Sequence, residues 1–281
     1  MKFLASSPSG LWMIDGPKAE CLEKTSYNTC YWGISWDETN VYAIKREYDE
    51  VDFLHVFDRN MKEIDKFLVP CKAAHQIVWD HKLYIANTGF NRITTWDGKD
   101  CGEIAWNPSG RDDNHINSVW SFKDELFALE NRGKPELGGR SNVVRIDKKS
   151  GKVDMRFQLG RDAHNIFCWG ATTWVCSSGD QSIIQYDMSR REIVKECRIN
   201  HAINRPNVFP RGMSYTGKHF FAGVSQSFRK GEQRNTTGGL VVVESEGLKF
   251  VEYYEFPGMD SIHDLRLIDG IDYAHNQRIP F

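Results

Sequence analysis

Four of the nine histidines, His75, His115, His164 and His263, stand at one recurring position at the start of short β-rich segments. In the two other copies of this segment, the position holds Arg211 and either Trp32 or Gly33. Imidazole is a common transition-metal ligand, and several rings converging on one axis could hold one ion. The pattern therefore predicts a divalent metal site on the four histidines, without distinguishing zinc, iron and calcium.

Two other interpretations of these positions remain open. Arg211 would be poorly placed beside a metal ion but well placed opposite a carboxylate or phosphate, so the site could be a metal-free one for an anion or a sugar. Alternatively, ring hydrogen bonds of the histidines could only tie neighbouring repeats together. The polar neighbours of the histidines could orient the rings from behind; these are Gln76, Asn114, Asn117, Asn165 and Asp264. We expect Asp264 to form an ion pair with Arg266, two residues further on the same strand.

Other polar residues lie in the recurring segments or in the loops that follow them, where they could contribute to the same site. We take Glu130 as a candidate general base and Arg211 as the group that fixes the substrate. Two long polar loops, at 130–140 and 225–239, each end in a pair of glycines and could bring positive charge over the site. The candidate substrate-binding residues are Asn87, Asn117, Arg132, Ser177, Arg229 and Arg234.

The segments that carry these residues belong to an internal repeat. Six apolar runs end in an acidic residue, and the steps between the acids are 43, 39, 50, 40 and 57 residues. Each run is preceded by further short segments rich in β-branched and aromatic residues, which favour strands. The tryptophans at 36, 79, 120 and 169 recur with the repeat, and we expect them to pack between units.

Four strands per unit of about 40–50 residues are typical of a β-propeller blade. The repeat is broken at its ends, because His263–Ile268 has no partners after it and Phe3–Ser7 has no first strand before it. We therefore predict an all-β, six-bladed propeller with four-stranded blades, closed by pairing of the N- and C-terminal strands. We predict one domain over 1–281, with blades at 31–72, 73–112, 113–161, 162–208 and 209–259, a last blade from 260–270 with 1–28, and a tail at 271–281.

In this repeat pattern the chain resembles the six-bladed propeller superfamily that includes the NHL-repeat, gluconolactonase-like and peptidylglycine-lyase-like proteins. The resemblance implies that the first strand of each blade lines a central channel and begins at its ligand-binding mouth. Peptidylglycine-lyase-like propellers bind zinc through histidines of different blades, and carotenoid-cleaving propellers bind iron through four. No substrate follows from this arrangement.

These observations predict a metal-dependent lyase or hydrolase acting on a small polar or anionic substrate. The alternative is a non-enzymatic module that binds a protein or a glycan on the propeller face, since propellers support both. A net charge of −2 argues against general nucleic-acid binding. No apolar run approaches the length of a membrane span, so we expect no membrane contact. The N-terminus lacks the apolar core of a signal peptide, and seven cysteines form no CxxC pair, so we expect a cytoplasmic protein.

Overall fold

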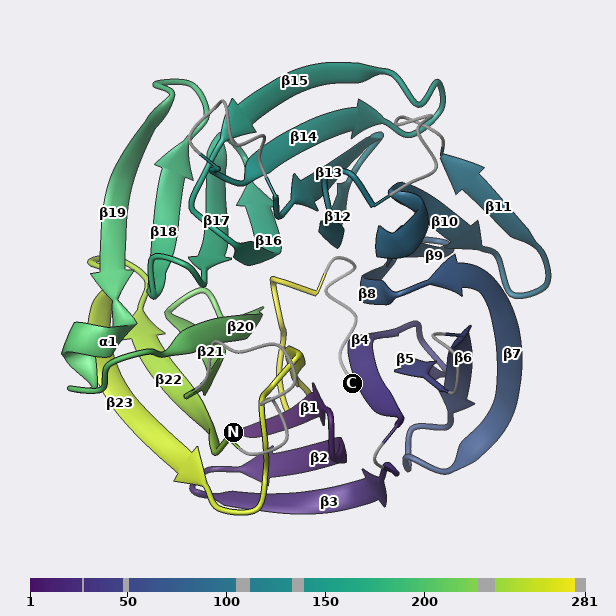
Figure 1. The fold of residues 1–281 in the computed structure, drawn as a ribbon, viewed down its shortest axis with the longest axis horizontal. Helices are drawn as coiled ribbons and strands as arrows, with labels where there is room; N and C mark the ends of the chain where they lie inside the picture. The colour runs from purple at the N-terminus through teal and green to yellow at the C-terminus, as the bar shows by residue number, and fades with distance from the viewer. Residues whose placement is uncertain (27, 48–50, 105–111, 133–138, 227–235, 276–281) are drawn as a thin grey trace.

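The computed structural model describes the chain except for residues 27, 48–50, 105–111, 133–138, 227–235 and 276–281. Its strands form six four-stranded antiparallel sheets, and the sheets follow one another around a central axis as the blades of a propeller (Figure 1). The predicted fold class is confirmed. Among the residues described, no helix has the length and apolar character that crossing a membrane requires.

Each blade is built from four strands, counted from the axis outwards. The innermost strands are β4 (Cys30–Trp36), β8 (Ala74–Trp79), β12 (Ile116–Phe122), β16 (Ala163–Trp169), β20 (Phe209–Tyr215) and β24 (Asp264–Leu267). The second strands are β5 (Val41–Arg46), β9 (Leu83–Asn87), β13 (Glu125–Glu130), β17 (Thr172–Ser177), β21 (His219–Ser225) and β1 (Lys2–Ser7). The third strands are β6 (Val51–Phe57), β10 (Arg92–Trp96), β14 (Asn142–Asp147), β18 (Ser182–Asp187), β22 (Gly238–Glu244) and β2 (Gly10–Asp15). The outermost strands are β7 (Glu63–Lys72), β11 (Cys101–Ile104), β15 (Val153–Gln158), β19 (Glu192–Arg198), β23 (Lys249–Phe256) and β3 (Lys18–Lys24). Two short helices lie in the connections, η2 (Thr88–Phe90) and α1 (Ile199–Ala202).

Burial falls from the axis to the rim of the ring. The inner strands β8, β12 and β16 are buried almost throughout, because a neighbouring blade covers each of their faces. The outer strands β3 and β15 alternate between exposed and half-buried residues, as expected for a strand with one solvated face. Trp36 and Trp120 are buried between blades as predicted, but Trp169 is 39% exposed, so its repeat position is not a core position in every blade.

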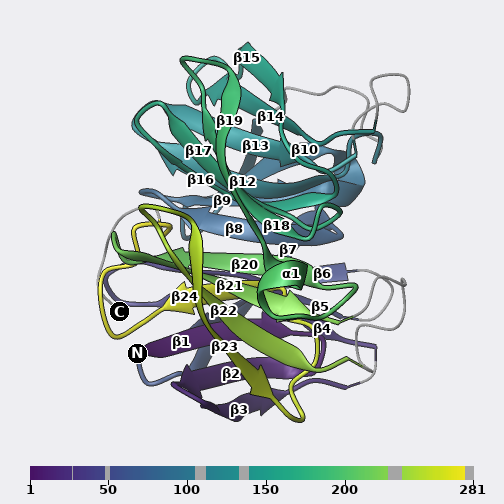
Figure 2. The same ribbon diagram turned by 90° about the vertical axis from the view of Figure 1, so that its left-hand side faces the viewer.

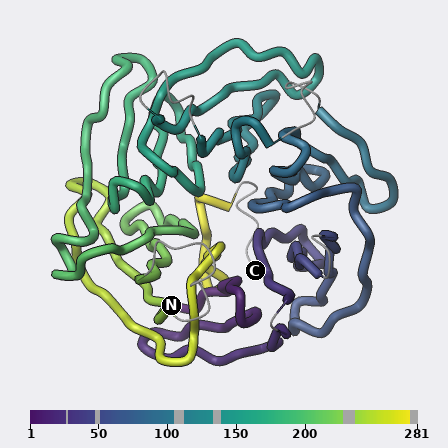
Figure 3. The backbone as a smooth tube through the Cα atoms, in the orientation of Figure 1, coloured from purple at the N-terminus to yellow at the C-terminus, as the bar shows by residue number. Residues whose placement is uncertain are grey.

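The ring is closed by the two chain ends. Strand β24 pairs antiparallel with β1, with Phe3 opposite Leu267 and Ser6 opposite Asp264. The last blade therefore takes its inner strand from the C-terminal part of the chain and its other three from the N-terminal part, as predicted from the broken repeat. The tube in Figure 3 follows this path from purple to yellow around the ring.

After β24 the chain turns back and packs against the ends of inner strands. The Asp272 carboxylate accepts hydrogen bonds from the Ser214 hydroxyl at 2.7 Å and from the backbone N–H groups of Tyr215 and Leu267. The His275 ring stacks on Trp36 and accepts from its backbone N–H. This segment lies on the same side of the ring as the N-terminus (Figure 2).

Candidate functional site

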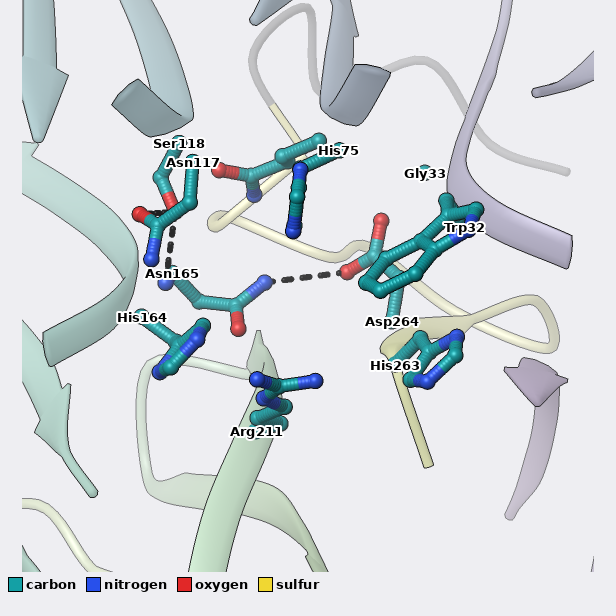
Figure 4. Close-up of a pocket in the computed structure, with 11 residues that line it drawn as sticks. Trp32, Gly33, His75, Asn117, Ser118, His164, Asn165, Arg211, His263 and Asp264 are labelled. Carbon is teal, nitrogen blue, oxygen red and sulfur yellow. Dashed lines mark hydrogen bonds between the residues drawn. The ribbon is translucent and has the colours of Figure 1, made fainter. Parts of the chain in front are cut away.

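Side chains from the inner strands enclose a small cavity on the axis of the ring. Trp32, His75, His164, Arg211 and His263 each come from a different blade, and Figure 4 shows them gathered around one centre. The rest of the lining is polar or glycine: Gly33, Gln76, Asn117, Ser118, Asn165 and Asp264. The free volume is about 10 Å³, which is room for about one water molecule or one small group of a ligand.

β-Bulges at the start of the inner strands set this arrangement. The strand register shifts between His164 and Ile166 and again between Arg211 and Met213, so one residue in each strand is unpaired. The unpaired residues, Asn165 and Gly212, have φ angles of 48° and 71°. A bulge bends the strand and redirects its side chains, and here it accompanies side chains that line the axis.

Because of these bulges, the predicted position of His115 at the axis is wrong. In β12 the shift falls between Ile116 and Ser118, so Ile116 occupies the position that His164 and Arg211 hold in their strands. His115 lies one residue earlier and does not line the cavity. Five of the six equivalent positions therefore supply a cavity-lining side chain, and three of those five are histidines.

Gly33 is required by the close approach of two blades. A Cβ at this position would lie 2.5 Å from the carbonyl oxygen of His75 and 2.5 Å from the backbone nitrogen of Ile77. Both atoms belong to the backbone and cannot rotate away. The glycine therefore lets β4 and β8 lie close enough for their neighbouring residues Trp32 and His75 to meet at the axis, with ring centroids 4.3 Å apart.

Hydrogen bonds behind the cavity fix the tautomers of the three histidines. The Nδ1 atoms of His75 and His263 lie 2.8 Å from the carbonyl oxygens of Ala73 and Tyr31, so they must carry the hydrogen. The Nδ1 atom of His164 donates to the Ser178 hydroxyl at 2.8 Å, because that hydroxyl itself donates to a carbonyl oxygen. Each Nε2 atom is therefore left as an acceptor.

The histidines do not combine into a metal site in the described part of the chain. No group of three or more His, Cys, Asp or Glu side chains is placed to hold an ion there. The Trp32 ring contacts both His75 and His263, stacking on His263 at 3.9 Å. The His115 ring is turned to Asp112, with its Nδ1 atom 3.0 Å from the carboxylate. The donor set does not fit a metal ion, and the predicted metal site finds no support.

A hydrogen-bonded floor lies under the cavity. The Asn165 side chain donates to Asp264 at 3.2 Å and accepts from the backbone N–H of Gly212 at 2.6 Å, so it joins three blades. Asp264 forms the predicted ion pair with Arg266, whose guanidinium lies 3.2 Å away and also donates to three backbone carbonyl oxygens. Burial raises the pKa of Asp264 to about 6, against the opposing effect of Arg266. The one carboxylate in the lining is therefore already neutralised by its own arginine.

Arg211 has no such partner. Its side chain is 91% buried, its Nε atom has no hydrogen-bond partner, and no carboxylate lies within 4 Å of it among the described residues. Its guanidinium lies over the Phe209 ring at 4.7 Å. Burial lowers the pKa of Arg211 to about 10, and the more distant Asp162 opposes this effect. Arg211 therefore stays charged at neutral pH, and within the described part of the chain no carboxylate compensates this cation at the cavity.

The adjacent imidazoles are neutral. Burial lowers the pKa of His75 well below its usual range, and His115, Arg46 and Arg211 act in the same direction. Burial likewise lowers the pKa of His164, with Arg211 as the next cause. At neutral pH the guanidinium of Arg211 is thus a charged group that faces the cavity beside two neutral imidazoles.

Several predicted site residues lie elsewhere. Glu130 is fully buried and receives hydrogen bonds from Asn114, Asn142 and Arg156, so its carboxylate is occupied and away from the cavity. The Asn87 amide bonds to Thr94 in its own blade and to Pro70 and Lys72 of the preceding blade.

The Ser177 hydroxyl likewise donates to Asp180 and accepts from the backbone N–H of Arg161. The next residue in each case, Thr88 or Ser178, is the one that contacts a cavity histidine. Thr88 and Ser178 directly follow the ends of β9 and β17, so the sequence signal for these contacts lay one residue beyond the chosen candidates.

The remaining substrate-binding candidates have mixed outcomes. Asn117 lines the cavity, and its amide donates to the carbonyl oxygen of Ala163. Arg132 lies outside the cavity with a side chain that is 57% exposed, 3.8 Å from Asp112. Arg229 and Arg234 lie outside the described residues.

The comparisons with known proteins agree with the fold. No protein-family model matches the chain, and a search of curated proteins found no match. Among solved structures, a protein of unknown function from Bacteroides caccae superposes with a TM-score of 0.70 at 14% identity, over 94% of this chain and 98% of that one. A chain of the nidogen/laminin complex gives 0.67 at 10% identity, over 94% and 97%. A luciferin-regenerating enzyme gives 0.58 at 16% identity, over 82% and 77%. Similarity at these identities shows the fold alone, which is that of a six-bladed β-propeller.

Proposed function

We propose that this propeller binds a small organic anion, with one carboxylate held by Arg211 at the inner end of the central channel. The observation that carries the proposal is the buried guanidinium, which has no carboxylate partner among the residues that the structure describes. A charge removed from water without compensation costs several kcal/mol, so folded proteins almost always pair it. Arg266, next to the same cavity, is paired with the carboxylate of Asp264. An anionic ligand would compensate the charge of Arg211 in the same way.

The chemistry of the lining supports a carboxylate. A guanidinium presents its N–H donors in a planar fork that fits two carboxylate oxygens. The neutral rings of His75 and His164 do not compete for the anion, and their Nε2 atoms can accept from a water molecule or a ligand hydroxyl beside it. The cavity admits one small group, so the rest of the ligand would lie further out in the channel.

Binding is better supported than catalysis at this site. The predicted general base, Glu130, is bonded to three side chains away from the cavity. Asp264, in the lining, is held by Arg266 and Asn165. The histidines are not arranged around an ion in the described residues, so we propose no metal-dependent step.

Thermal unfolding in the presence of acetate tests the proposal. A ligand that binds the folded state alone raises the unfolding temperature with the logarithm of its concentration. We expect this for acetate, compared with equal ionic strength of sodium tosylate, whose anion is too large for the cavity. Arg211→Met should abolish the effect.

Arg190→Met is the matched control, because Arg190 is an exposed arginine that pairs with Asp187 and Glu192 at the protein surface. It should keep the full response to acetate. An acetate response that survives Arg211→Met would show that the anion binds elsewhere, and no response in the wild type would end the proposal.

A further inference from the structure

Outside the cavity, an imidazole and a guanidinium already hold a carboxylate. The two oxygens of Asp112 lie 3.0 and 3.2 Å from the Nδ1 atom of His115, and one lies 3.8 Å from the guanidinium of Arg132. His115 and Arg132 thus form a carboxylate-binding pair, which we call the rim pair. Asp112 is the residue that occupies it.

The rim pair is built on a fixed backbone. The backbone N–H of Asn131 donates to the carbonyl oxygen of His115 at 3.0 Å, and that of Arg132 donates to the carbonyl oxygen of Asn114 at 3.1 Å. These bonds hold the two segments that carry the pair side by side. The rim pair is therefore positioned by the fold and not only by its contact with Asp112.

The rim pair lies close to the cavity. The His115 ring meets the His75 ring edge to face, with centroids 5.2 Å apart, and His75 lines the cavity. The imidazole of His75 thus lies between the cavity and the rim pair. A ligand with a carboxylate on Arg211 and a short carbon chain leading outwards would bring a second acidic group to His115 and Arg132.

We infer that the ligand is a small dicarboxylate, whose outer carboxylate displaces Asp112 from the rim pair. This inference rests on the proposed function, because it assumes that the first carboxylate is bound by Arg211. Asp112 is exchangeable in this sense, since its side chain is 35% exposed and a surface ion pair contributes little free energy. In the unliganded protein it acts as an internal competitor that sets the affinity for the second acid.

Matched ligands separate the two carboxylate positions. Succinate and butyrate have equal chain lengths and differ in one acid group, so calorimetric titration of both measures the rim contribution. Two equivalent acid groups alone give succinate a statistical advantage of two. In the wild type we expect succinate to bind more tightly than that, by roughly two- to fivefold further, as for one partly exposed charge pair.

Substitutions at the rim pair and at Asp112 should change the ratio of the succinate and butyrate affinities in opposite directions. Asp112→Asn removes the competitor and should raise the succinate-to-butyrate ratio by about two- to fivefold. Asp113→Asn removes the same charge from the neighbouring exposed residue and should leave the ratio unchanged. Arg132→Gln should lower the ratio towards the statistical value, because only His115 of the rim pair would remain. These signs would not arise from a general loss of stability.

The outcomes distinguish the two proposals. If butyrate binds in an Arg211-dependent way but the ratio stays at the statistical value in the wild type and in Asp112→Asn, the rim inference is wrong and the anion site stands. If neither acid binds, both proposals are wrong. A ratio that rises equally in Asp112→Asn and Asp113→Asn would reduce the effect to overall charge and overturn the role of Asp112.

Discussion

Replacing Arg211 with methionine should stabilise the protein in the absence of small anions, although it removes a buried arginine from the centre of the fold. Burial lowers the pKa of Arg211 from 12.5 to about 10. At about 1.4 kcal/mol per pKa unit, keeping the charged form in place costs about 3 kcal/mol. Methionine keeps an unbranched apolar side chain and a favourable sulfur contact with the Phe209 ring. We therefore expect Arg211→Met to raise the free energy of unfolding by about 2–3 kcal/mol.

The same substitution at Arg266 should have the opposite sign. Arg266 is paired with Asp264 and donates to the carbonyl oxygens of Ile34 and Met213. Arg266→Met would leave a buried carboxylate and these carbonyl groups without their donor, which costs about 3–5 kcal/mol. The two variants thus compare Arg211, which lines the cavity without a carboxylate partner among the described residues, with Arg266, which is paired with the lining residue Asp264.

Urea unfolding followed by tryptophan fluorescence measures both changes. The buffer should contain only bulky anions, and the slope of the free energy against urea should stay equal among the variants. If Arg211→Met were destabilised as strongly as Arg266→Met, the Arg211 charge would be compensated within the folded chain. That result would refute the reasoning from its unpaired state.

Two further changes test other parts of the account. Stability should fall by about 2 kcal/mol from pH 7 to pH 6, because His75, His164 and His275 have folded pKa values well below 6.5 and take up protons only on unfolding. The raised pKa values of Asp264 and Asp272 oppose part of this loss, increasingly as the pH falls through about 6, since those carboxyls bind protons in the folded state first. Stability that is flat between pH 7 and 6 would contradict the neutral histidines. Gly33→Ala should cost about 1–3 kcal/mol in urea unfolding, because its methyl group would press on the backbone of the next blade. Gly102→Ala on the outer strand β11 is its control, since the nearest atom there is a side-chain hydroxyl at 3.0 Å, and equal losses in the two variants would count against the close approach at Gly33.

The fold could be predicted because each blade repeats a pattern that short-range physics imposes. Acidic residues end most of the third strands, as at Asp147 and Asp187, where their carboxylates accept hydrogen bonds from the next turn. The closure could be predicted because the first and last segments of the chain each lacked a partner. Both signals depend on neighbours in the sequence or on the count of repeats.

The site was only partly predictable, because β-bulges change which residue faces the axis. Counting from His75 and His164 placed His115 in the same register, but the unpaired residue in β12 makes Ile116 the equivalent position. Asn87 and Ser177 were also chosen as site residues, but the residue after each of them, Thr88 or Ser178, makes the contact with a histidine.

The sequence also does not show which charged residues from distant parts of the chain pair in the fold. The sequence indicated that Arg211 and Arg266 stand near the axis, and two-residue spacing suggested a partner for Arg266. It gave no sign that Arg211 would lack one. Glu130 looked free in the sequence, but Arg156 from the outer strand of the same blade reaches its carboxylate.

A crystal structure of the protein grown with sodium bromide tests the anion site most directly, because bromide can replace a small anion and is located by its anomalous scattering. The account predicts a strong anomalous peak within hydrogen-bonding distance of the Arg211 guanidinium, beside His164, and no peak there in Arg211→Met. Bromide peaks confined to the outer surface, with the Arg211 side chain turned to a protein partner, would contradict it.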